Sequence, residues 1–279
     1  MRTELIKGSV RGLKAYVPGE QPEGQKVVKL NTNENPYPPS PQVVQALQQF
    51  DADTLRKYPN PSSDAVRARL AELHGCGVEN VFVGNGSDEV LALCTRAFVE
   101  DSGSIGFFDP SYSLYPVLAA IRDVGTCPVE LDGTFQWQMP APDLCSLFFL
   151  TNPNAPTSMR FPKADVEAFC ETFKGVVLVD EAYVDFASEH CMDLALKYQN
   201  VLTLRTLSKS YSLAALRVGY VVGAAPLIEA LMKVKDSYNL DGVAQALALA
   251  ALNDVAHMRA NAERIIASRQ GLSAALTEF

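Results

Sequence analysis

Short apolar segments alternate with helical segments through most of the chain, and this alternation limits the fold more than any other feature. The apolar segments lie at 81–83, 104–108, 147–150, 176–179, 201–204 and 219–222. Helical periodicity appears before and between them, at 42–50, 63–74, 89–99, 112–120, 163–173 and 193–198. Strands that are apolar on both faces and separated by helices indicate a mostly parallel sheet flanked by helices on both sides. The predicted fold class is therefore α/β.

The two ends of the chain differ from this middle part. Residues 1–29 are rich in glycine, proline and charge, which predicts an N-terminal arm rather than a core element. Beyond Leu227 the pattern is almost entirely helical. We expect a large α/β domain over residues 30–250 and a helix over residues 251–279 that leads out of it.

The charge and the cysteines exclude several classes of function. The formal net charge is −8 and no Lys/Arg run is present, which argues against binding to nucleic acid or to an anionic membrane surface. The apolar runs are too short to span a bilayer, and the first residues lack the apolar stretch of a signal peptide. Six scattered cysteines without a CxxC pair are typical of reduced thiols. We expect a cytoplasmic protein without a metal site.

Polar residues follow five of the predicted strands, at the point where each strand ends. The turns lie at 84–89, 109–112, 151–154, 180–183 and 206–209. In open α/β sheets, ligands bind at the carboxyl ends of the strands. Five polar turns at one edge of one sheet therefore predict a binding site at that edge.

Lys209 and Asp180 are the two charged side chains at these strand ends that are the main candidates for catalysis. A lysine nucleophile must lose its proton, which requires partial burial or a nearby cation, and Arg205 and Arg217 are candidates for that cation. Taken alone, Lys209 is more typical of an exposed lysine in a turn. Asp180 ends an apolar strand, where a carboxylate requires a partner such as a protonated pyridine nitrogen. A structural aspartate that caps the next turn is the alternative.

The turn at 84–89 joins a strand to a helix and contains two glycines. Glycines let the backbone direct N–H groups inward, and a helix start adds the positive end of its dipole, so the turn suits a phosphate. A tight turn that binds no ligand is the alternative. It matches neither GxGxxG nor GxxxxGK[ST], which leaves a dinucleotide-binding dehydrogenase or a P-loop protein without its fingerprint. Ser208 and Arg217 are candidates to complete the phosphate site. Tyr112 is a candidate to stack on a planar ring, although a lone tyrosine is more often packed at a helix start. Tyr183 is a candidate to donate to a phenolate-type oxygen.

The order of these motifs resembles that of the fold-type I aminotransferases, which use pyridoxal 5′-phosphate (PLP). In chain order, the shared motifs are the turn at 84–89, Tyr112, Asn-Pro-Asn-x-Pro-Thr at 152–157, Asp-Glu-Ala-Tyr at 180–183, and Thr206-Leu-Ser-Lys209 with Arg217 eight positions on. The stretches 10–16, 30–36 and 58–61 are similar to the histidinol-phosphate aminotransferase branch. The resemblance covers nearly all 279 residues. It implies a fold-type I PLP transferase that moves an amino group between L-histidinol phosphate and 2-oxoglutarate, with glutamate as the other product, in histidine biosynthesis.

The resemblance also implies a role for each matched residue at the cofactor. Lys209 forms the Schiff base with PLP and moves the Cα proton, Asp180 pairs with the pyridine nitrogen, and Tyr183 contacts the ring oxygen. Tyr112 stacks on the ring. The remaining implied cofactor contacts are Gly86, Ser87, Asp88, Thr206, Ser208 and Arg217.

Three further residues are implied at the edges of this site. Tyr58 would reach the cofactor phosphate of the neighbouring subunit, which implies a homodimer with shared active sites. Tyr16 and Asn33 lie where this branch of the family meets its substrate.

The sequence departs from the family pattern at two places. Where the family has an asparagine bonded to the ring oxygen, this chain has Ala155, so either Asn154 takes that role or Tyr183 works alone; the lost bond is worth about 1.5–3 kcal/mol. Family members also continue past the equivalent of Phe279 into a small domain that carries the substrate-binding arginines. We therefore expect a truncated chain, with the small domain largely missing, that binds PLP but transaminates poorly.

Two alternatives stay open on the sequence alone. The same pocket serves a threonine-phosphate decarboxylase or an aromatic amino-acid aminotransferase, because the cofactor performs the bond breaking and the protein selects the bond. A folded fragment that binds the cofactor but is inactive, and acts only as a partner or regulatory module, is the other alternative.

Overall fold

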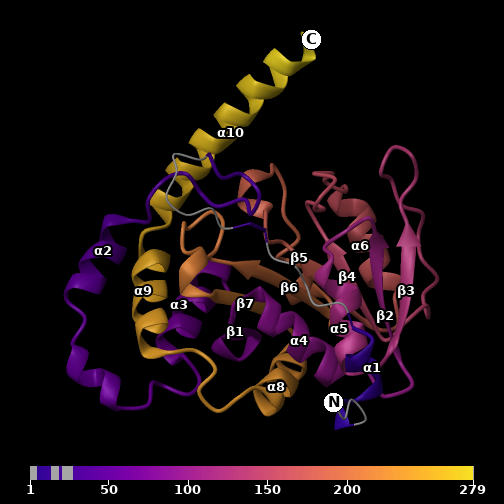
Figure 1. Cartoon of the computed structure of the whole chain (residues 1–279), viewed down its shortest axis with the longest axis horizontal. Coiled ribbons are helices and arrows are strands. Elements are labelled where there is room, and N and C mark those ends of the chain that lie inside the picture. Colours follow the sequence, from indigo (N-terminus) through magenta and orange to yellow (C-terminus); the bar gives the residue numbers. More distant parts are fainter. Residues whose placement is uncertain (1–4, 14–18, 21–27, 279) are drawn as a thin grey trace.

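A seven-stranded sheet forms the centre of the molecule (Figure 1), in the order β1-β7-β6-β5-β4-β2-β3. The computed structural model describes residues 5–13, 19–20 and 28–278. The strands are β1 (Val81–Asn85), β2 (Ser104–Asp109), β3 (Gly125–Glu130), β4 (Leu147–Thr151), β5 (Val176–Asp180), β6 (Val201–Thr206) and β7 (Val218–Gly223). Strand β7 runs antiparallel to both of its neighbours, and the other pairings are parallel. The predicted mostly parallel α/β sheet is confirmed.

Strand β3 is the element that the sequence pattern does not predict. It forms the edge of the sheet beside β2, and its residues alternate between exposed and half-buried. It contains Pro128, which lacks the N–H that a central strand would need and is tolerated at an edge. An edge strand of this kind has no continuous apolar run, so the pattern that identifies the other strands is absent.

Helices cover both faces of the sheet and gather at its β1 end (Figure 1). They are α1 (Gly8–Arg11), α2 (Pro41–Gln48), α3 (Asp64–His74), α4 (Ser87–Phe98), α5 (Leu114–Arg122), α6 (Lys163–Thr172), α7 (Leu194–Lys197), α8 (Ala225–Val234), α9 (Gly242–Asn253) and α10 (Val255–Thr277). Strand residues alternate between two buried clusters, so that Phe149 and Leu178 pack with α4, α5 and α8. Their neighbours Leu150 and Val179 pack with α3, α6 and α9 on the other face. The sheet is therefore apolar on both sides, which leaves its ends as the place for polar groups.

Helix α10 begins beside the sheet and then extends away from the rest of the molecule (Figure 1). Its buried residues are Met258, Asn261 and Ala262, all in its first turns. The predicted helix after residue 250 is present, while the division into domains stays a prediction. Within the described part of the chain, no helix is long and apolar enough to cross a membrane.

Candidate active site

Lys209 lies in the wall of a cavity of about 1110 Å³. Its Nζ donates a hydrogen bond to the carbonyl oxygen of Thr32 at 2.9 Å and lies 5.5 Å from the centre of the Tyr183 ring. Asn35 Nδ2 donates to the main-chain carbonyls of Lys209 at 3.0 Å and Ser210 at 3.2 Å. The segment after residue 30 thus holds the lysine loop in place while the amine faces the cavity.

Asn33 and Tyr183 share this cavity with Lys209. Asn33 Nδ2 donates to the Tyr183 hydroxyl at 3.0 Å, across 150 residues of sequence. The hydroxyl keeps its own proton for a further acceptor. Of the two residues predicted at the substrate, the structure therefore places Asn33 next to the lysine, while Tyr16 lies outside the described residues.

Asp180 ends β5 and is buried, with 4% of its surface exposed. Its carboxylate accepts hydrogen bonds from the Tyr115 hydroxyl at 2.9 Å and from the Ala182 N–H at 3.1 Å. Burial raises the pKa of Asp180 to about 6, although these two hydrogen bonds partly offset the rise. Among the described residues, no cation pairs with this carboxylate. A protonated pyridine nitrogen carries the charge that would compensate this carboxylate.

The turn between β1 and α4 forms an open cradle of backbone. Gly86 has a φ of +83°, and a Cβ there would lie 2.4 Å from Nη2 of Arg217. Gly219 passes so close on β7 that a Cβ would lie 2.4 Å from the main-chain nitrogen of Ser87. Helix α4 starts at Ser87 and directs its free N–H groups into this turn. The cradle suits a phosphate, and side chains at either glycine would fill it.

Polar side chains close this cradle on the other sides. Arg217 Nη2 lies 3.2 Å from Oδ2 of Asp88, and its Nη1 lies 3.5 Å from Oγ of Ser208. The Tyr112 hydroxyl donates to the other oxygen of Asp88 at 3.3 Å. Thr206 Oγ1 donates to Ser208 Oγ at 3.0 Å. The structure thus brings the predicted phosphate and ring-stacking residues together.

Asn154 is buried, and its side-chain amide is fully engaged within the protein. Its Nδ2 donates to the Pro110 carbonyl at 3.0 Å and to Thr157 Oγ1 at 2.9 Å, and its Oδ1 accepts from Ser111 at 2.7 Å. Both amide protons already have acceptors, so a bond from Asn154 to a ring oxygen would require breaking one of them. The Tyr183 hydroxyl needs no such change.

Tyr58 is the predicted cofactor residue that does not join the others. Its side chain is 81% exposed and stacks on Tyr238, with 4.4 Å between ring centres and 14° between ring planes.

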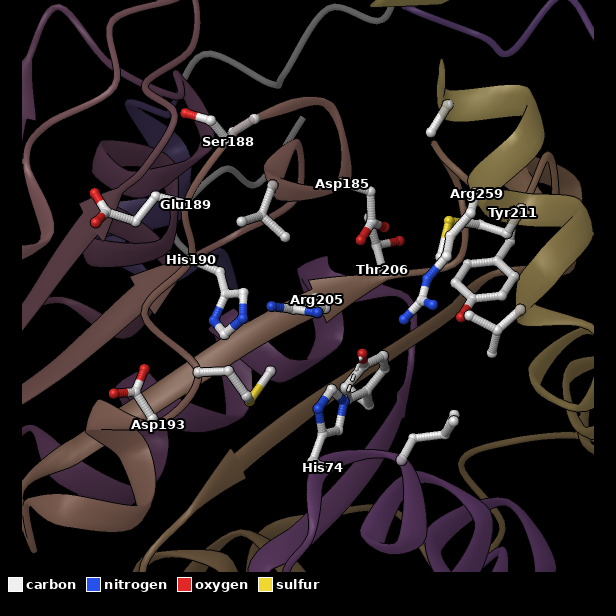
Figure 2. A pocket seen from close by; sticks show the side chains of 18 of the residues that line it. His74, Asp185, Ser188, Glu189, His190, Asp193, Arg205, Thr206, Tyr211 and Arg259 are labelled. Carbon is white, nitrogen blue, oxygen red and sulfur yellow. Dashed lines mark hydrogen bonds between the residues drawn. The ribbon is translucent and has the colours of Figure 1, made fainter. Parts of the chain in front are cut away.

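Arg205 does not serve Lys209 as a cation. Its Nη2 lies 2.8 Å from Oε2 of the buried Glu181, and it lines a second cavity of about 510 Å³ that does not include Lys209 (Figure 2). His74 Nε2 and the Tyr220 hydroxyl are hydrogen-bonded there at 3.0 Å, and burial lowers the pKa of His74 to about 4. Glu181 is therefore paired with Arg205 within the protein.

Two groups of site residues received no individual role in the predictions made on sequence. Tyr115 and Thr151 contact each other and connect to Asp180. Glu89 accepts from the Asn85 N–H and from Asn239 Nδ2 at 2.9 Å, which braces the phosphate turn. A signal existed for the first pair, because Tyr115 follows Tyr112 by three residues and Thr151 is the last residue of its strand.

Residues 25–279 match the family model described as aminotransferase class I and II. The chain is 46% identical over 270 residues to histidinol-phosphate aminotransferase 2 of Thiobacillus denitrificans, covering 94% of this chain and 75% of that protein. It is 47% identical over 270 residues to histidinol-phosphate aminotransferase of Chromohalobacter salexigens, covering 94% of this chain and 76% of that protein.

Solved structures show the same fold. Histidinol-phosphate aminotransferase from Sinorhizobium meliloti, in complex with pyridoxal-5′-phosphate, superposes with a TM-score of 0.79 at 25% identity, covering 86% of this chain and 68% of that one. Aspartate aminotransferase from Thermus thermophilus with maleate gives a TM-score of 0.78 at 22% identity, covering 89% of this chain and 71% of that one. The chain thus spans about three quarters of the curated relatives named above.

Proposed function

The chain belongs to the aminotransferase class I and II family, and from that premise we propose that it transfers the amino group between L-histidinol phosphate and 2-oxoglutarate. The fold and the similarity to enzymes of that name support the reaction class and its cofactor, PLP. The observation that carries the proposal is the buried carboxylate of Asp180, which has no cation among the described residues and lies one strand away from the Lys209 loop.

The residues present fit this cofactor. The glycine cradle before α4, with Arg217 and Ser208, would hold the phosphate, and Asp180 would pair with the protonated pyridine nitrogen. Tyr112 would lie against the ring. The Tyr183 hydroxyl, which accepts a hydrogen bond from Asn33, would donate to the ring oxygen. When bound, PLP supplies an electron sink that lets a bond at the amino acid's Cα break.

The reaction also needs a group that holds and moves protons, and Lys209 is placed for this. Its amine lies at the cavity wall against a neutral carbonyl, that of Thr32, rather than in an ion pair among the described side chains. In its unprotonated form, the Lys209 amine has a lone pair that can take the Cα proton and return it. The side-chain amide of Asn35 fixes the main chain of Lys209.

The substrate, the assembly and the compartment are also part of the proposal. The names of the curated relatives support histidinol phosphate as the amino donor, with glutamate formed from 2-oxoglutarate. The exposed Tyr58 supports a homodimer in which each chain contributes to its partner's cofactor phosphate. All six cysteines are free thiols, which supports a location in the reducing environment of the cytoplasm.

The test begins with cofactor attachment. The purified chain is mixed with PLP, reduced with borohydride and digested, and we expect mass spectrometry to find the cofactor on Lys209. Glutamate formation from 2-oxoglutarate is then followed with histidinol phosphate, phenylalanine and O-phosphothreonine as alternative substrates, with carbon dioxide release measured for the last. The highest kcat/KM is expected for histidinol phosphate, and none for Lys209→Ala. Label on another lysine, or preference for another substrate, would contradict the proposal.

A further inference from the structure

A chain of hydrogen bonds runs from Asp180 to Asn154 through three hydroxyl groups. Tyr115 Oη lies 2.9 Å from Oδ2 of Asp180 and 2.6 Å from Oγ1 of Thr151. Thr151 lies 3.1 Å from Oγ of Ser111, which lies 2.7 Å from Oδ1 of Asn154. These residues come from β5, α5, β4 and the turns after β2 and β4.

Both ends of this chain are acceptors when Asp180 is ionised. A carboxylate has no proton to give. The Asn154 amide is oriented so that its nitrogen donates to the Pro110 carbonyl, and this leaves its oxygen toward Ser111. Tyr115 is fully buried, and Thr151, Asn154 and Asp180 are each at most 4% exposed. Ser111 is half-buried, so it is the links from Asp180 to Thr151 to which solvent has little access.

The protons and the links do not match in number when Asp180 is ionised. Four links join the five groups, but only the hydroxyls of Tyr115, Thr151 and Ser111 carry protons. One link is then left with two lone pairs facing each other. If Asp180 is protonated, each link has one proton, and every hydroxyl donates away from Asp180 toward Asn154.

We propose that Tyr115, Thr151 and Ser111 form a relay that sets where the proton at Asp180 resides, and so couples the cofactor's pyridine nitrogen to Asn154 at the cavity wall. This inference rests on the proposed function for its role with PLP. Without the cofactor the relay favours the carboxylic acid. With a pyridinium in place, the Tyr115 hydroxyl turns to donate to the carboxylate and the unfilled link moves to the longest contact, between Thr151 and Ser111.

The relay makes Tyr115 and Thr151 act in opposite directions. Tyr115→Phe removes the donor of the ionised carboxylate and also the acceptor of the protonated acid. Because a hydrogen bond to a charged group is worth more than one to a neutral group, the ionised form loses more and the carboxylate becomes more basic. Thr151→Val removes one proton and two links, which leaves two protons for two links. Tyr115 is then free to donate to Asp180, and the carboxylate becomes less basic. A loss of packing alone has no reason to give opposite signs.

Other charged groups around Asp180 stay the same in both variants. The carboxylates of Asp88 and Glu181 raise the pKa of Asp180, and burial contributes most to the rise. The Tyr115 ring stacks on Phe149 at 4.7 Å, and phenylalanine keeps that contact. The hydroxyl is therefore what the Tyr115→Phe comparison tests.

The deciding experiment uses the protein without PLP. Infrared difference spectra against Asp180→Asn report the protonated carboxyl of Asp180 as the pH is varied. We expect the proton affinity of Asp180 to rise roughly tenfold in Tyr115→Phe, as befits a lost hydrogen bond to a charged group, and to fall in Thr151→Val. Shifts of the same sign in the two variants, or no shift in either, would overturn the relay.

A second measurement ties the relay to the cofactor. PLP dissociation constants at pH 8 are compared by fluorescence quenching for the same variants. We expect Tyr115→Phe to bind roughly tenfold more weakly, because the ion pair with the pyridinium loses its support, and Thr151→Val to bind at least as tightly as the unmodified chain. Weaker binding in both variants would contradict the relay. Absence of PLP binding in the unmodified chain would instead contradict the proposed function, and the titration without PLP would still decide the relay.

Discussion

At the scale of single residues, Asp180 is a buried carboxylate whose charge makes folding less favourable. Burial raises the pKa of Asp180 from 3.8 to about 6, so the ionised form is disfavoured in the folded protein. The folded protein then binds this proton more tightly than the unfolded chain. The contribution of Asp180 to stability is therefore largest below about pH 4, falls as the pH rises toward 6, and stays lower above it.

Replacing Asp180 by asparagine removes this cost. We expect Asp180→Asn without PLP to be more stable than the unmodified chain at pH 8, by about 3 kcal/mol, and the difference to shrink as the pH approaches 4. The same variant should lose tight PLP binding, because the pyridinium loses its counter-charge. Urea unfolding without cofactor at the two pH values measures the first effect.

The exposed Asp236 offers a matched control. Asp236→Asn makes the same chemical change at the surface, where a substitution costs less than about 0.5 kcal/mol at either pH. If the two variants change the free energy of unfolding by the same amount at each pH, burial of the ionised Asp180 carboxylate does not destabilise the protein.

At the scale of elements, β7 sets the shape of the phosphate cradle. Gly219 pairs with Gly84 on β1, and a Cβ at Gly219 would lie 2.4 Å from the nitrogen of Ser87 and 2.6 Å from the carbonyl carbon of Gly86. Both contacts are with backbone, which cannot rotate away. The strand and the turn therefore approach as closely as they do because residue 219 has no side chain.

Gly219→Ala should push the turn out of position. We expect a loss of about 1–3 kcal/mol in stability from overpacking, together with weaker PLP binding, because the N–H groups at the start of α4 would move. Thermal unfolding and PLP titration measure the two effects. Gly133→Ala, in an exposed turn with nothing within 4 Å of the new Cβ, should change neither. Unchanged PLP affinity in Gly219→Ala would contradict the assignment of this turn to the phosphate.

The elements also show what the sequence can and cannot predict. Strands that are apolar on both faces can be recognised from the sequence by their continuous apolar runs. The polar turns after them locate the site, because the carboxyl ends of parallel strands meet at the same edge of the sheet. The edge strand β3 has no such pattern. The contacts of Tyr115 with Asp180 and Thr151 depend on the rotamers of buried side chains from three elements, which a one-dimensional pattern does not contain.

At the scale of the whole molecule, Tyr58 is the feature that one chain alone does not explain. It lies on the surface, stacked on Tyr238, while the other predicted cofactor residues gather at the sheet edge. Tyrosines that expose a large apolar ring are frequent anchors at protein interfaces. In a two-fold dimer, each chain would present its Tyr58 to the same place on its partner.

Mixing two inactive variants tests whether the active sites are shared. In a heterodimer of Lys209→Ala and Tyr58→Ala chains, one site would carry both defects and the other would have an intact Lys209 and an intact Tyr58 from the partner. Random pairing makes about half of the dimers mixed, so we expect about one quarter of the unmodified activity after the chains are unfolded and refolded together. Each variant refolded alone should stay near its own low activity. If Tyr58 instead served the Lys209 of its own chain, no site in any pairing would be intact, and mixing would restore nothing.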